Sequence, residues 1–143
     1  MPKLNNICYA VIAAVIILIS ACAKDKKTPA PLTDTRNQYI GTWRCYEKST
    51  LGSTFIPITI SKDTINQVYI RIYNFRNLGP TIFANAIIDY TNISIPQQQI
   101  TGAGGSYTIE GSGQFLSNQL NLTYTSSDGV DPVTNYTATC LKN

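Results

Sequence analysis

From residue 39 to the C-terminus, apolar and polar residues alternate with a period of two, and this pattern restricts the fold more than any other feature. In one segment, Ile56, Ile58 and Ile60 occupy every second position. Such spacing places side chains on one face of a β-strand, whereas a helical face needs apolar residues three and four positions apart. No stretch of this region keeps the helical spacing. The sequence therefore predicts an all-β domain.

Short clusters of turn-forming residues divide the alternating region into short strands. The expected strands are residues 39–48, 55–61, 67–73, 81–88, 92–95, 98–100, 106–115, 119–126 and 136–142. Pro96 has no N–H to donate to a strand ladder, so we expect it to separate two short strands. About eight strands joined by hairpin-length loops predict a small antiparallel meander, either a barrel or a sandwich.

The N-terminal residues have a different character. Lys3 and the free amine precede an apolar run at residues 7–19, and the small residues Ser20 and Ala21 follow it. The run holds about 13 residues, fewer than the roughly 20 that a transmembrane helix needs. A short apolar run between a basic start and small residues is typical of a cleaved signal peptide. The alternative is an ordinary signal peptide or a membrane span, with a passive cysteine at position 22.

Ile-Ser-Ala-Cys at residues 19–22 resembles the lipobox of bacterial lipoproteins. The resemblance implies cleavage before Cys22, a diacylglyceride on its sulfur and acylation, for example with palmitate, of the new amine. We therefore expect a lipoprotein signal peptide at 1–21, a lipidated N-terminus and disordered tether at 22–36, and the all-β domain at 37–143. Ala23 is not acidic, and by the same resemblance this favours the outer membrane, on either its periplasmic or its surface face.

Charge and cysteine counts change once the leader is removed. The whole chain has a formal net charge of +3, but the basic and acidic residues from 37 onward balance. A balanced domain lacks the one-signed field of a nucleic-acid-binding protein, so we expect no nucleic-acid partner. Of the four cysteines, only Cys45 and Cys140 lie in the expected β domain.

Cys45 and Cys140 are expected to form a disulfide, since two cysteines in an exported chain most simply pair. Zinc is the rival interpretation, but the chain has no histidine to complete a tetrahedral site. Both residues fall on the apolar faces of the first and last expected strands. A bridge between those strands requires the sheet to close or nearly close.

Two stretches resemble small lipocalin-like outer-membrane lipoproteins of the Bacteroidota: Gly41-Thr42-Trp43, and YTIEGSGQFLSNQLNLTYT at residues 107–125. The resemblance implies a lipocalin-like barrel whose floor is closed by Gly41 and Trp43, and a location in the cell envelope. The chain is shorter than a true lipocalin and shows no helix after the last expected strand. Members of this group are mostly of unknown function, so the resemblance implies little chemistry.

The sequence predicts binding rather than catalysis. Without histidine there is no Ser-His-Asp or Cys-His site, and no spacing brings two acids together. We therefore expect no enzyme activity, no cofactor and no metal. Tyr69, Arg71 and Tyr73 form a candidate binding face, because aromatic rings beside a guanidinium suit a sugar or a protein partner. Cross-strand packing of these tyrosines is the simpler alternative.

The expected function is a membrane-anchored binding or envelope-structural module. Its partners would be the membrane, through the lipid, and a small apolar ligand, a glycan or an envelope protein. An accessory or inhibitor-like subunit acting through a protein partner is the alternative. An apolar cavity inside the barrel would favour a ligand carrier, whereas an interior filled by side chains would favour action at the surface.

Replacing Cys22 with serine tests the lipoprotein prediction. The Cys22→Ser variant has no thiol to accept lipid, so it is expected in the soluble fraction after cell breakage while the wild-type protein sediments with membranes. Immunoblotting of the two fractions measures the difference. A variant that stays with the membrane as completely as wild type would contradict lipidation at this residue.

Overall fold

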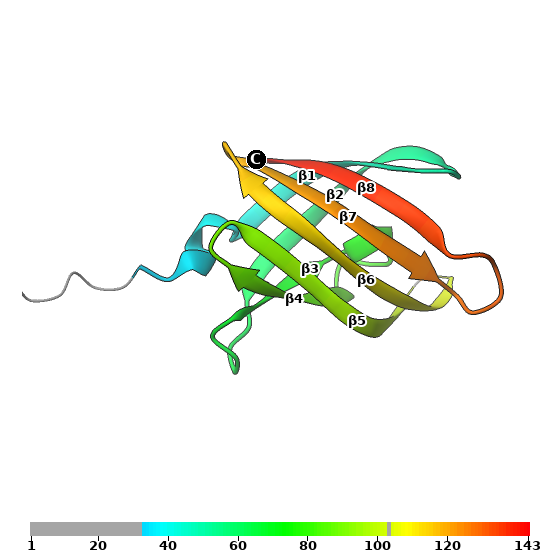
Figure 1. Cartoon of the computed structure of the whole chain (residues 1–143), viewed down its shortest axis with the longest axis horizontal. Helices are drawn as coiled ribbons and strands as arrows, with labels where there is room; N and C mark the ends of the chain where they lie inside the picture. Colours follow the sequence, from blue (N-terminus) through cyan, green and yellow to red (C-terminus); the bar gives the residue numbers. More distant parts are fainter. Residues whose placement is uncertain (1–32, 103) are drawn as a thin grey trace, which may run out of the picture. The chain divides into compact units, whose positions relative to one another are not determined.

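A computed structural model describes residues 33–102 and 104–143 as one closed antiparallel barrel (Figure 1). Each strand pairs with the next, and the last pairs with the first. The strands are β1 Gly41–Ser49, β2 Gly52–Lys62, β3 Tyr69–Tyr73, β4 Phe83–Asp89, β5 Asn92–Gly102, β6 Gly105–Leu116, β7 Gln119–Ser127 and β8 Thr134–Lys142. The all-β meander is confirmed, and it closes as a barrel rather than as a sandwich.

Two short 3-10 helices, η2 (Thr35–Gln38) and η3 (Phe75–Asn77), accompany the strands. The strand directions define two ends of the barrel. The base holds η2, the β2–β3 loop, the β4–β5 turn and the β6–β7 turn, and there the chain joins the barrel (Figure 1). The mouth holds the β1–β2 turn, η3, the β5–β6 turn and the β7–β8 loop.

Pairing of β1 with β8 closes the barrel. The register runs from Trp43 opposite Lys142 to Ser49 opposite Tyr136. Cys45 and Cys140 are direct cross-strand partners within this register, and they are joined by a disulfide that links positions 95 residues apart in sequence. The predicted pair is therefore at disulfide distance, on the inner face of the barrel, where both side chains are buried.

The barrel interior is filled by side chains from the inward positions of the strands. An eight-stranded barrel encloses a space just wide enough for side chains. Its buried apolar residues are Tyr39, Trp43, Cys45, Ile56, Ile58, Ile60, Ile70, Ile72, Phe75, Leu78, Ala84, Ala86, Ile88, Ile93, Ile95, Ile100, Ile109, Leu120, Leu122, Tyr124, Tyr136, Ala138 and Cys140. Burial of this apolar surface is the main stabilising contribution to the fold.

One glycine is needed for this packing. Gly111 on β6 faces Tyr124 on β7 in the strand register. A Cβ atom at Gly111 would lie 2.5 Å from both the Tyr124 Cβ and the Thr123 carbonyl oxygen. The missing side chain therefore lets β7 approach closely and lets the Tyr124 ring lie inside the barrel.

Pro96 does not divide its strand, contrary to the sequence prediction. β5 is continuous from Asn92 to Gly102, with a shift in its pairing with β6 between Ile95 and Gln98. The Gln98 side chain takes over part of the ladder to β4, because its Oε1 accepts from the Asn85 N–H and its Nε2 donates to the Asn85 carbonyl, both at 2.8 Å. A side-chain amide thus replaces the backbone pairing that a bulged strand loses.

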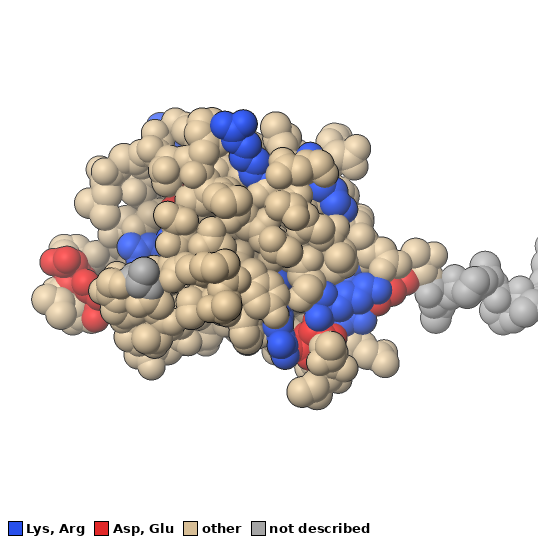
Figure 2. Space-filling view, turned by 180° about the vertical axis from the view of Figure 1, so that it is seen from behind, with Lys and Arg blue, Asp and Glu red and all other residues tan. Residues whose placement is uncertain are grey.

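The folded unit begins at Thr33, a few residues before the expected start of the β domain at residue 37. Arg36, expected in the tether, is buried at the base of the barrel. Its Nη1 donates to the carbonyl oxygens of Asp63, Asn66 and Tyr69 at 3.3, 3.2 and 3.3 Å. Asp34 pairs with the same guanidinium at 2.8 Å, and basic and acidic side chains lie side by side at this end (Figure 2).

Removing the disulfide is expected to destabilise the barrel without changing its topology. A Cys45→Ala, Cys140→Ala variant should lose about 2–5 kcal/mol of unfolding free energy, because the bridge restricts the unfolded chain over a long loop. Urea unfolding of the variant and of oxidised wild type under non-reducing conditions measures the loss. Equal denaturation midpoints would contradict a stabilising bridge, and reduced wild type is the matched control.

Candidate functional site

The mouth of the barrel has a part covered by η3 and a depression beside β1, β2 and β8. Phe75 of η3 packs against Tyr124 with 4.6 Å between ring centroids, and Leu78 is buried just after the helix. The depression has a volume of about 260 Å³. It is lined by Glu47, Ser49, Leu51, Gly52, Ser53, Thr54 and Tyr136. We call this depression the mouth site.

Glu47 is the charged group of the mouth site. It follows Trp43 and Cys45 on the inner face of β1 and is only 7% exposed. The Tyr124 hydroxyl donates a short hydrogen bond to its Oε2. Burial raises the pKa of the Glu47 carboxyl, against the opposing effects of the Tyr124 hydrogen bond and the Arg76 charge. Burial and the neighbouring carboxylate also raise the pKa of Tyr124.

The second carboxylate oxygen of Glu47 is available to a ligand. Within residues 33–102 and 104–143, no hydrogen bond reaches Oε1. In the same residues, every fully buried side-chain nitrogen or oxygen of the interior has a hydrogen-bond partner. Oε1 is therefore not fully buried, and Glu47 is one of the residues that line the depression. A mostly buried carboxylate with one open acceptor is the strongest binding feature of the barrel.

Arg76 of η3 supplies the opposite charge beside the mouth site. Its Nη1 donates to Ser126 Oγ at 2.9 Å and its Nη2 to the Tyr136 hydroxyl at 3.0 Å. The guanidinium also lies over the Tyr107 ring, 4.3 Å from the centroid, and near the Tyr136 ring at 5.1 Å. These contacts hold Arg76 although its backbone is left-handed, with φ of 57°, a conformation that is costly for such a residue.

Aromatic stacking makes the wall of the mouth site rigid. Tyr136 lies parallel to Tyr124, with 4.9 Å between centroids and 6° between ring planes. The two rings link Glu47 on one side to Arg76 on the other. The site thus combines an acceptor carboxylate, hydroxyl groups and a nearby cation whose charge offsets that of Glu47. Such a set suits hydrogen bonding to a neutral polar ligand.

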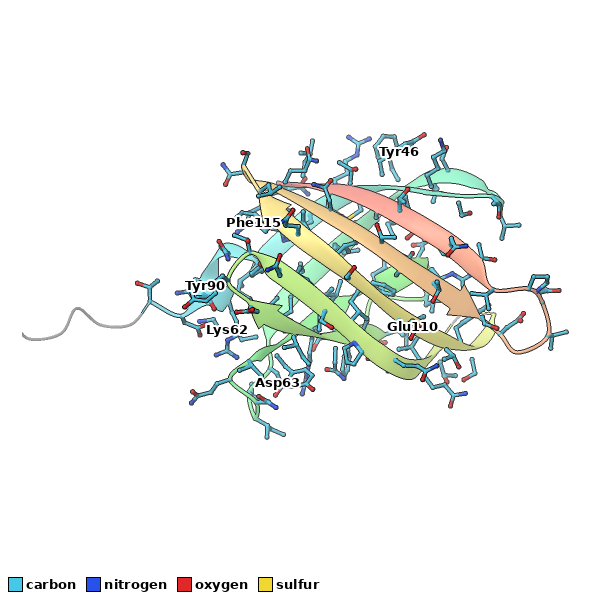
Figure 3. The ribbon with its side chains drawn as sticks, viewed as in Figure 1. Tyr46, Lys62, Asp63, Tyr90, Glu110 and Phe115 are labelled. Atoms are coloured by element: carbon cyan, nitrogen blue, oxygen red, sulfur yellow. A yellow bond between two sulfur atoms is a disulfide. The ribbon has the colours of Figure 1, made fainter. Side chains whose placement is uncertain are left out.

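A second surface lies on the outer face of β1, β2 and β8. It is a groove of about 550 Å³ lined by Arg44, Tyr46, Phe55, Thr139, Leu141 and Asn143. Tyr46, Phe55 and Leu141 are 43%, 58% and 57% exposed, and Tyr46 points away from the barrel (Figure 3). The Arg44 guanidinium lies 4.4 Å from the Phe55 centroid. We call this surface the outer groove.

The predicted binding face on β3 is occupied by its own neighbours. Arg71 pairs with Asp63 at 2.7 Å and lies over the Phe83 ring at 4.9 Å. Tyr73 packs on Phe83 across the β3–β4 ladder, 5.3 Å between centroids. Tyr69, Arg71 and Tyr73 are all half-buried on the outward side of β3. Such contacts agree with the simpler alternative, in which these side chains pack against neighbouring residues of the barrel. The mouth site is therefore the better candidate for binding.

Gly41 and Trp43, for which the resemblance implied a role in the barrel floor, lie at the base. The Trp43 side chain is fully buried, and its indole N–H donates to the Tyr39 carbonyl at 2.8 Å. Its ring meets Phe115 edge-on at 6.0 Å. Gly41 begins β1 with φ of 127°. The two residues are therefore far from the mouth site, and they bear on closure of the barrel rather than on binding.

Cys22 lies outside the described residues, so its lipidation stays a prediction. Among residues 33–102 and 104–143 no helix is long and apolar enough to cross a membrane. The same residues contain no cluster of three or more side chains suited to hold a metal ion.

Comparison of the chain with protein families, with characterised proteins and with solved structures finds no match. The resemblance to lipocalin-like lipoproteins therefore stays a prediction, and the site is interpreted from its own geometry.

Sequence reasoning missed both charged residues of the mouth. Glu47 could have been predicted from the sequence, because it lies two residues after Cys45 and four after Trp43, on the same inward face of β1. A charged residue in phase with buried ones indicates an inward-facing carboxylate. Arg76 had no such signal, since it lies in a turn 50 and 60 residues from its partners Ser126 and Tyr136.

The raised pKa of Glu47 predicts a specific pH dependence. In the unfolded chain the Glu47 carboxyl has its usual pKa of 4.5, whereas in the native barrel its pKa is higher. The native carboxyl therefore still holds its proton at a pH where the unfolded one has lost it. Wild type should therefore lose stability relative to Glu47→Gln as the pH rises from 4.5 through the raised native pKa. The loss amounts to about 1.4 kcal/mol for each pH unit that separates the native pKa from the unfolded one.

Urea unfolding of both proteins at pH 4 and pH 8 measures this difference. Glu110→Gln, a change on the outer face of β6 (Figure 3), is the matched control. A difference between wild type and Glu47→Gln that stays constant with pH would contradict the prediction.

Proposed function

We propose that this protein is a non-enzymatic binding module, held at the outer membrane by a lipid on Cys22, that binds a polar ligand at the mouth of its barrel. The observation that supports this most directly is Glu47, a mostly buried carboxylate with one oxygen open to the mouth site. Buried polar groups normally have hydrogen-bond partners, so an open acceptor in a packed barrel points to an external partner.

The filled interior supports action at the surface. Trp43, the isoleucines and the inward tyrosines occupy the space in which a lipocalin-type carrier would hold an apolar molecule. Of the expected partners, a glycan or an envelope protein therefore fits this barrel better than a small apolar ligand.

The direction of the chain supports a membrane-tethered arrangement. The folded unit starts at the base of the barrel, opposite the mouth site. Residues 22–32 separate the proposed lipid from this point and, fully extended, reach about 36 to 40 Å. The proposed tether therefore joins the domain at the end opposite the mouth site.

An accessory subunit that acts through a protein partner is the second candidate, and the outer groove favours it. Arg44, Tyr46 and Phe55 are of the types that dominate binding energy in protein interfaces. Tyr46, Phe55 and Leu141 are all exposed on this one face of the sheet. Apolar side chains grouped in this way indicate a binding surface, whereas single exposed ones need no explanation. In this alternative the partner covers β1, β2 and β8 on the outside of the barrel.

Native mass spectrometry of the mature lipoprotein, purified from its own host without a tag, tests these functions. The binding module predicts a non-covalent small-molecule adduct that is reduced in Glu47→Gln and kept in Glu110→Gln. The accessory subunit predicts a stoichiometric protein complex that is lost in Phe55→Ser and kept in Glu47→Gln.

Bare protein under all growth conditions of the host would contradict both functions. Turnover of a co-purified molecule into a covalently altered product would contradict the non-enzymatic assignment. Thermal unfolding of each variant checks that a lost adduct reflects binding rather than misfolding.

A further inference from the structure

We propose that the mouth site binds a single saccharide unit, with the Glu47 carboxylate accepting hydrogen bonds from ligand hydroxyl groups. This inference rests on the proposed function and names the ligand class of that site. It depends on the open oxygen of Glu47, the hydroxyl-bearing lining, the size of the depression and its balanced charge.

The first step is the direction of hydrogen bonding. Oε2 of Glu47 already accepts from Tyr124, whereas Oε1 has no donor within the described part of the chain. At a pH above its raised pKa the Glu47 carboxyl is ionised, and an ionised carboxylate only accepts hydrogen bonds, so its partner must donate. A sugar hydroxyl donates, and a hydrogen bond to a charged acceptor is stronger than one between neutral groups.

The second step is the lining around Glu47. Ser49 lies two residues further along the same face of β1, and Thr54 faces Glu47 across the β1–β2 ladder. Both side chains line the depression, and each hydroxyl donates as well as accepts. A ligand whose neighbouring hydroxyls also do both satisfies all three side chains at once.

The third step is size and shape. Typical sites for drug-sized ligands hold about 300–1,000 Å³, and the mouth site, at about 260 Å³, is smaller. It is open to solvent on one side, so a terminal sugar of a longer glycan enters it while the rest of the chain stays outside. The packed interior of the barrel prevents deeper entrance.

The fourth step is charge, which separates a sugar from an ammonium ligand. Arg76 is the charged group that acts on Glu47 from η3, and its field opposes that of the carboxylate. A cationic ligand would be attracted by Glu47 and repelled by Arg76, whereas a neutral polyhydroxylated ring has no net charge to be repelled. The pair therefore favours a neutral donor-rich ligand.

Saturation-transfer NMR on the mature lipoprotein in zwitterionic, sugar-free detergent micelles tests this proposal. The probes are glucose, galactose, mannose and N-acetylglucosamine, with ethanolamine as the ammonium probe. At least one sugar should receive saturation from wild type and from Glu110→Gln. Its dissociation constant should rise about tenfold in Glu47→Gln, the loss expected for one charge-assisted hydrogen bond.

Thr54→Val is the second variant, because its exposed position lets the barrel fold while one lining hydroxyl is lost. Weaker sugar binding in both variants supports the proposal. Binding of ethanolamine alone, or of no probe, overturns it. Sugar binding that both substitutions leave unchanged also overturns it, but leaves the broader binding function standing, because the contact then lies elsewhere on the domain.

Discussion

Hydrogen bonding between the first strand and the last is the interaction on which the rest of this structure depends. Pairing of β1 with β8 removes the free sheet edges that would otherwise promote aggregation, and it fixes the barrel at eight strands. That number leaves room inside for side chains only. The disulfide of Cys45 and Cys140 lies within this seam. Gly111 lets the inward Tyr124 fit inside the same closed space.

A filled barrel restricts where polar chemistry can occur. Glu47 is the next inward residue after Cys45 on β1, and it lies at the edge of the buried core, close to the solvent at the mouth. There its carboxylate is shielded enough for burial to raise its pKa, yet one oxygen remains open. Arg76 reaches the same region from η3 through Tyr136. The opposite charges neutralise each other through a stacked tyrosine pair rather than by direct contact.

The features that the sequence predicts well are those encoded between near neighbours. Alternation of Ile56, Ile58 and Ile60 depends on adjacent positions, and it predicts strands and inward faces correctly. Cys45 and Cys140 are predictable because few cysteines remain to pair. Pro96 misleads, because the Gln98 side chain replaces the lost backbone bonds through a contact with β4. The hydrogen-bond partners of Arg36 and Arg76 are distant in sequence and come close only in the closed barrel. No local sequence pattern therefore predicts these contacts.

The hydrogen bonds of Arg36 also have a mechanical consequence. For a domain held through its N-terminus, any pull on the chain arrives first at η2, where the Arg36 guanidinium grips three carbonyls of the β2–β3 region. Several hydrogen bonds loaded together resist more force than bonds broken one after another. The load therefore enters the barrel at its base, the end opposite the mouth site.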